Sequence, residues 1–138
     1  MSELEARREL VQAWLAKASQ DLQAAELLNQ DQASFAEVIL SHCQQSAEKA
    51  LKAFLQWSNV RFPKTHDLTL LLDLCVELQA DFGELAEPCR ELRSLAVDSR
   101  YPLEDPEGEL LSPNAAMEHA HHVLDCVLWQ LPSGATGS

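Results

Sequence analysis

Helical periodicity over the first 28 residues is the feature that most constrains the fold of this chain. From Leu4 to Leu28, apolar side chains recur every three or four residues, which places them on one face of an α-helix. No run of β-branched residues alternating with polar ones, the pattern typical of strands, occurs anywhere in the sequence. The sequence therefore predicts a long amphipathic helix. Its apolar face consists of Val11, Trp14, Ala18, Leu22, Ala25 and Leu28.

A second helix follows a short polar exit from the first. Ser34 followed three residues later by Glu37 is a capping box, so we expect the helix to begin there. It should end near Asn59, because Pro63 prevents continuation. Its predicted buried face comprises Ile39, Cys43, Ala47, Ala50, Phe54 and Trp57.

Three shorter helices complete the predicted architecture. Thr65 or Asp67 caps the third, the fourth spans about 84–97, and Ser112 followed by Pro113 begins the fifth. Pro132 ends the fifth, and we expect residues 133–138 to be disordered. The predicted fold is all-α, an antiparallel up-and-down bundle of four to five helices forming one domain over residues 1–132.

Composition narrows the classes of partner. A formal net charge of −12 and a pI near 4.6 disfavour duplex DNA and anionic membranes, since phosphates would be repelled over most of the surface. No signal peptide or spanning apolar run is apparent, so a cytoplasmic protein with reduced cysteines is expected. Cys43, Cys75 and Cys126 lie among apolar helix positions, where burial is expected. Glu118 and His121 have a metal-ligand spacing, but no second copy exists. We therefore predict no metal and no cofactor.

The charge is unevenly distributed along the chain. Residues 33–66 hold four Lys/Arg against two acids, whereas the rest of the chain holds six Lys/Arg against twenty acids. Such a locally cationic segment on an anionic protein is the most plausible place for an anionic ligand or partner.

Two groups of polar residues are candidate sites, and each has a plain structural alternative. His42, Gln45, Lys49 and Lys52 form one stripe at helical spacing. The stripe could bind an anion, or it could be a solvated face in which Glu48 pairs with Lys52, and the residues alone favour the solvated face. In the long acidic segment 98–112, Arg100 beside Tyr101 could bind phosphate or pair with a nearby carboxylate.

Four short motifs follow one another along the chain: WxxxAxxDLxxA at 14–25, QQSAEKALKA at 44–53, THDL at 65–68 and SRYP at 99–102. Together they give the chain, over about residues 10–130, a resemblance to the HEPN family, small helical domains often encoded beside minimal nucleotidyltransferases. The family fold is a bundle of four or five helices, commonly a homodimer.

The resemblance implies two classes of function. One is a non-catalytic partner of a minimal nucleotidyltransferase that contributes a surface binding a nucleotide such as ATP or another substrate. The alternative is a metal-independent ribonuclease toxin, which uses an Arg followed after four to six residues by a His across a dimer.

The ribonuclease motif is missing where the family would carry it. None of Arg90, Arg93 and Arg100 is followed by His at the required distance. Arg61 and His66 have the required spacing, but they lie in the loop between helices two and three. Without an imidazole, a general acid or base suited to neutral pH is lacking. We therefore favour the binding partner. Its predicted binding residues are Gln45, Glu48, Lys49, Lys52, His66, Arg100 and Tyr101.

We also expect a homodimer. Leu51 and Leu55 lie beside the Ala50 and Phe54 face of the second helix, which suggests a second apolar face. In a bundle this small, such a face would be exposed unless another copy covered it.

The purified protein is expected not to cleave RNA, because the Arg and His pair that would perform the proton transfers is absent from the expected helix. The measurement is incubation with total RNA and with tRNA in the presence of a chelator. Cleavage that disappears in Arg100→Ala would contradict this expectation and restore the toxin alternative.

Overall fold

The computed structural model describes residues 2–98 and 111–136, and within them the chain is all-α, as predicted. Five α-helices are joined by short turns and 3-10 segments. The α-helices are α1 (Glu3–Leu28), α2 (Gln32–Trp57), α3 (Leu68–Leu78), α4 (Ala86–Asp98) and α5 (Pro113–Gln130), and the 3-10 segments are η1 (Asn29–Asp31), η2 (Ala80–Leu85) and η3 (Ser133–Ala135).

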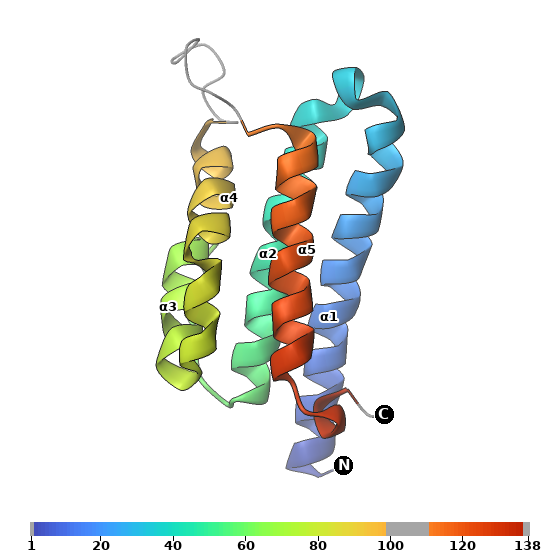
Figure 1. The fold of residues 1–138 in the computed structure, drawn as a ribbon. Helices are drawn as coiled ribbons and strands as arrows, with labels where there is room; N and C mark the ends of the chain where they lie inside the picture. Colours follow the sequence, from blue (N-terminus) through green and yellow to red (C-terminus); the bar gives the residue numbers. More distant parts are fainter. Residues whose placement is uncertain (1, 99–110, 137–138) are drawn as a thin grey trace.

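Helix α2 lies at the centre of the bundle. It packs against α1 and α5 on one side and against α3 and α4 on the other (Figure 1). Buried apolar side chains from all five helices form one continuous core around it. As a result, α2 has little free surface, and most of its side chains from Ile39 to Leu55 are buried.

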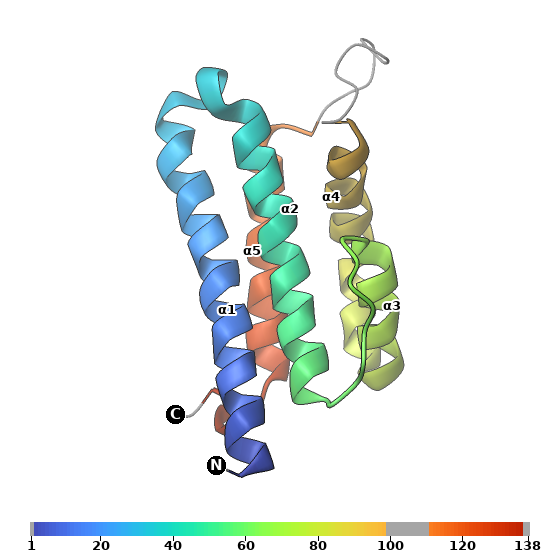
Figure 2. The ribbon, with the colours of Figure 1, turned by 180° about the vertical axis from the view of Figure 1, so that it is seen from behind.

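The connection between α2 and α3 determines which residues come together. After α2 ends, Asn59 takes a left-handed conformation (φ 57°) that turns the chain, a conformation that Asn adopts more readily than most residues. The chain then runs back along the bundle, opposite to the direction of α2, before α3 begins (Figure 2). Helix α3 therefore runs in the same direction as α2, and residues near the end of the connection lie beside the middle of α2.

Most predicted helix ends are confirmed. Asp67 is the N-cap of α3, and Ser112 with Pro113 begins α5. The start of α2 was predicted wrongly. Asp31 caps the helix by accepting a hydrogen bond from the Ser34 N–H, so the helix begins at Gln32, and the non-helical Phe35 marks a kink near the predicted start.

The C-terminal segment also differs from the prediction. Residues 133–136 were expected to be disordered, yet η3 packs on the bundle and Ala135 is buried. The Gln12 side chain of α1 donates a hydrogen bond to the Thr136 carbonyl (2.8 Å). A small apolar residue and a backbone carbonyl thus anchor this segment, although its composition gives no helical pattern.

Leu51 and Leu55, which suggested a second exposed face, are both buried within the single chain. Helices on both sides of α2 cover them, so they provide no argument for a dimer. The four cysteines are free as expected and all are buried, and burial raises the pKa of Cys43, Cys75 and Cys89 to about 12. Among the described residues, every helix is too short or too polar to cross a lipid bilayer.

Asp67→Ala should lower the free energy of unfolding at pH 7 by about 1 kcal/mol, because it removes the N-cap of α3. The hydrogen bond from Thr69 holds the pKa of Asp67 below its ordinary value of 3.8. The stabilisation is therefore complete above pH 3.8 and is lost as the pH falls through the lowered pKa.

Urea denaturation of wild type and Asp67→Ala, at pH 7 and in acid, measures this effect. The control is Asp73→Ala, since Asp73 is an exposed acid within α3 and caps no helix. An equal cost of Asp67→Ala at both pH values would show that the carboxylate is not the stabilising group.

Candidate functional site

Several polar side chains of α2 are buried among the apolar residues of the bundle. Ser46 is fully buried, and Gln44, Glu48 and Lys52 are nearly so. Buried polar groups must be hydrogen-bonded or paired within the protein, because each loses its contacts with water. The partners of these side chains therefore define the organisation of the site.

Glu48 is the centre of the first group of contacts. Its Oε2 accepts a hydrogen bond from the Lys52 ammonium, one turn further along α2 (3.0 Å), and its Oε1 lies 2.8 Å from Nδ1 of His66 in the α2–α3 connection. The carboxylate and the ammonium are 5% and 8% exposed, whereas the His66 side chain is 81% exposed. A buried ion pair thus holds one edge of a surface imidazole.

Two aromatic rings from other segments surround the Lys52 ammonium. Its Nζ lies 5.4 Å from the ring centroid of Trp14 in α1 and 6.0 Å from that of Phe62 in the connection. The two rings contact each other edge to face, with centroids 6.4 Å apart. These contacts and the ion pair with Glu48 make Lys52 part of the framework of the bundle.

A second charged group joins α1 to α2 about one helical turn away. Asp21 of α1 accepts from the Lys49 ammonium (2.5 Å) and lies 2.9 Å from His42 Nδ1. Asp21 is itself buried. Lys49 is therefore neutralised by an acid from outside the cationic segment.

The structure brings together three of the predicted binding residues, Glu48, Lys52 and His66. Lys49 lies nearby but pairs with Asp21. Gln45 donates a hydrogen bond to the Ser41 hydroxyl of the same helix (3.0 Å). Arg100 and Tyr101 lie outside the described residues. The binding role of all seven remains a prediction. The stripe is not a simple solvated face, because Lys52 is buried and Lys49 is half-buried.

Two further cations of the same segment remain available. Arg61 and Lys64 are exposed in the α2–α3 connection, and neither forms an ion pair with any described residue. With Lys49 and Lys52 neutralised, the positive charge of residues 33–66 that is free to meet an anion lies in this connection. It is the same segment that carries the exposed ring of His66.

Sequence reasoning missed some members of these groups. Asp21 and Gln44 were noted only as motif letters, Trp14 was expected only as part of the apolar face of the first helix, and Phe62 was not singled out. Gln44 is one turn before Glu48 on the same helix face, and this spacing was the available signal. The role of Asp21 had no local signal, because its partners are 21 and 28 residues away.

The arginines of α4 are engaged within the protein. Arg90 pairs with Glu87 one turn before it, and Arg93 pairs with Asp67 at the start of α3 (3.2 Å). Neither has a histidine at the spacing of the ribonuclease motif. These two arginines therefore stabilise helix ends and helix contacts.

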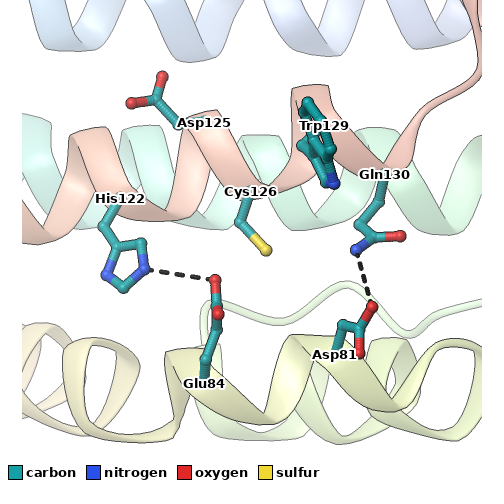
Figure 3. A pocket seen from close by; sticks show the side chains of 7 residues that line it. All are labelled: Asp81, Glu84, His122, Asp125, Cys126, Trp129 and Gln130. Atoms are coloured by element: carbon teal, nitrogen blue, oxygen red, sulfur yellow. Dashed lines mark hydrogen bonds and ion pairs between the residues drawn. The ribbon is translucent and has the colours of Figure 1, made fainter.

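A separate hollow of about 460 Å³ lies between η2 and the C-terminal half of α5 (Figure 3). His122 faces Glu84 and Gln130 faces Asp81 across it. Its other lining residues are Asp125, Cys126 and Trp129. Burial and the nearby Glu84 raise the pKa of Cys126 to about 11, so this thiol is protonated at neutral pH. Three carboxylates make the hollow unfavourable for a phosphate.

Comparison with known proteins agrees with the motifs and the fold. The model of the HEPN domain family matches residues 11–129, so the chain belongs to the HEPN family. Among solved structures, the crystal structure of an archaeal HEPN homologue aligns with a TM-score of 0.66 and 26% sequence identity. The alignment covers 87% of this chain and 96% of the archaeal chain. No curated protein gives a significant match.

Lys52→Met should lower the free energy of unfolding by about 3–5 kcal/mol, because it leaves Glu48 charged and buried without its counterion. The double variant Glu48→Leu with Lys52→Met removes both charges, so it should lose less than the sum of the two single variants.

Urea denaturation of the four proteins measures this coupling. Lys17→Met is the matched control, since Lys17 is exposed on α1 and its replacement should change the free energy of unfolding by less than about 0.5 kcal/mol. Additive losses in the double variant would contradict an energetic link between Glu48 and Lys52.

Proposed function

We propose that this HEPN protein is a binding partner of a minimal nucleotidyltransferase, without a ribonuclease site of its own, and that it contributes a surface for a nucleotide such as ATP. The observation that supports this most directly is the composition of the α2–α3 connection. It carries two exposed cations free of described partners, Arg61 and Lys64, and the exposed ring of His66.

The charge of this surface suits a phosphate ligand. Lys and Arg form charge-assisted hydrogen bonds with phosphate oxygens, and Arg does so in a bidentate geometry. On a protein with a net charge of −12, an anion would be repelled elsewhere. The aromatic pair Trp14 and Phe62, both half-buried, borders the same region.

The ribonuclease alternative is less well supported. Arg90 and Arg93 are paired, and neither precedes a histidine at the required distance. The overall negative charge also opposes binding of a long polyanion more strongly than binding of one nucleotide.

A homodimer forms part of this proposal. Its support is membership of the HEPN family, in which homodimers are common. Leu51 and Leu55 are buried, and the exposed leucines of α1, Leu4, Leu10 and Leu27, do not share one helix face.

Titration with ATP tests the proposed ligand. Arg61→Ala and Lys64→Ala should each weaken ATP binding by about 1–3 kcal/mol, because each removes a charged contact with phosphate. Both residues are exposed, so the circular dichroism spectrum should stay unchanged. Lys17→Ala, which removes an exposed cation from α1, should bind ATP like wild type.

Co-expression with a minimal nucleotidyltransferase encoded beside the chain tests the proposed partner, by co-purification and size-exclusion chromatography. Failure to co-purify would contradict the partnership. Equal ATP affinities in all four proteins would show that the connection is not the binding surface.

A further inference from the structure

All five histidines of the chain lie against a carboxylate, and one of these pairs differs from the rest. In the pair of His66 with Glu48, the imidazole is 81% exposed and the carboxylate only 5% exposed. In the other four pairs, the two side chains differ far less in exposure; His121 and Glu26, for example, are both 49% exposed. His66 is thus a surface ring fixed from below by a buried acid.

A second buried side chain holds the same residue. The Gln44 amide donates a hydrogen bond to the His66 backbone carbonyl (3.2 Å). Gln44 and Glu48 are one turn apart on α2, so side chains on one helix face contact both the main chain and the ring of His66. Burying a Gln and a Glu costs stability unless both are hydrogen-bonded, and their contacts with His66 hold this residue in a defined position.

The contact with Glu48 decides which ring nitrogen faces outward as an acceptor. A carboxylate can only accept a hydrogen bond, so in the neutral imidazole Nδ1 carries the proton and donates to Glu48 Oε1. Nε2 then presents its lone pair away from Glu48, and it has no hydrogen-bond partner among the described residues. Lys52 pairs with Oε2 of Glu48, so Oε1 is left to contact the ring of His66.

A metal ion is not the natural occupant of this position. In the described parts of the chain, no group of three or more His, Cys, Asp or Glu side chains could hold one. An exposed imidazole lone pair would instead accept a hydrogen bond from a hydroxyl or N–H group of a ligand.

We propose that His66 accepts a hydrogen bond from a ribose hydroxyl of a nucleotide whose phosphates bind Arg61 and Lys64. This inference rests on the proposed nucleotide-binding function and specifies the ligand as a nucleoside phosphate with a free ribose hydroxyl. Arg61 and His66 are five residues apart, so their Cα atoms are at most about 18 Å from each other. Their side chains can therefore reach the ribose and the phosphates of one nucleotide. In this arrangement, Gln44 and Glu48 are positioning residues.

Three ligands separate the contributions to binding: ATP, 2′,3′-dideoxy-ATP and tripolyphosphate. Wild type should bind ATP about tenfold more tightly than the dideoxy analogue, the factor expected for one hydrogen bond. His66→Ala should abolish that preference and leave tripolyphosphate binding unchanged. Arg61→Ala with Lys64→Ala should weaken all three ligands. His121→Ala removes another exposed histidine and should behave like wild type.

Nitrogen NMR of the imidazoles tests the tautomer on which the inference depends. In wild type, the His66 resonances should report a ring protonated at Nδ1. A ring protonated at Nε2, or a preference for ATP that is the same in His66→Ala as in wild type, would overturn the inference.

If wild type binds ATP and the dideoxy analogue equally, this inference fails and nucleotide binding stands. If wild type binds none of the ligands, nucleotide binding fails as well.

Discussion

Burial of polar side chains on the central helix is the constraint on which the rest of the structure depends. Helix α2 is covered by its neighbours, yet it carries Gln44, Glu48 and Lys52 in its buried part. Each needs a partner inside the protein, and α1 and the α2–α3 connection supply most of them. The fold therefore places a set of mutually satisfied polar contacts within an apolar bundle.

These contacts give two motifs of the sequence a physical role. In THDL, Thr65 accepts from the Asp67 N–H, His66 meets Glu48, Asp67 caps α3, and Leu68 enters the core. In the motif at 44–53, Ser46 donates to the Ala18 carbonyl of α1, and small alanines let the helices approach closely. The same residues that join the segments also orient the exposed ring of His66.

The sequence predicted what depends on local pattern. Helical class, the caps at Asp67 and Ser112 and the buried face around Ile39 and Ala47 follow from spacing and from backbone hydrogen bonding. Contacts with residues far along the chain could not be predicted from the sequence. Lys49 looked free because Asp21 is 28 residues away, and Leu51 looked exposed because the helices that cover it come later.

The buried pair of Glu48 and Lys52 has a consequence for the history of the sequence. If either position changed alone, the other charge would be stranded in the core, and a protein of ordinary marginal stability has little reserve to survive that step. Lineages of this protein would then keep both residues or exchange both together for apolar ones. A chain that had made the exchange would lose the carboxylate that orients His66, so the pair links the survival of the fold to that of the site.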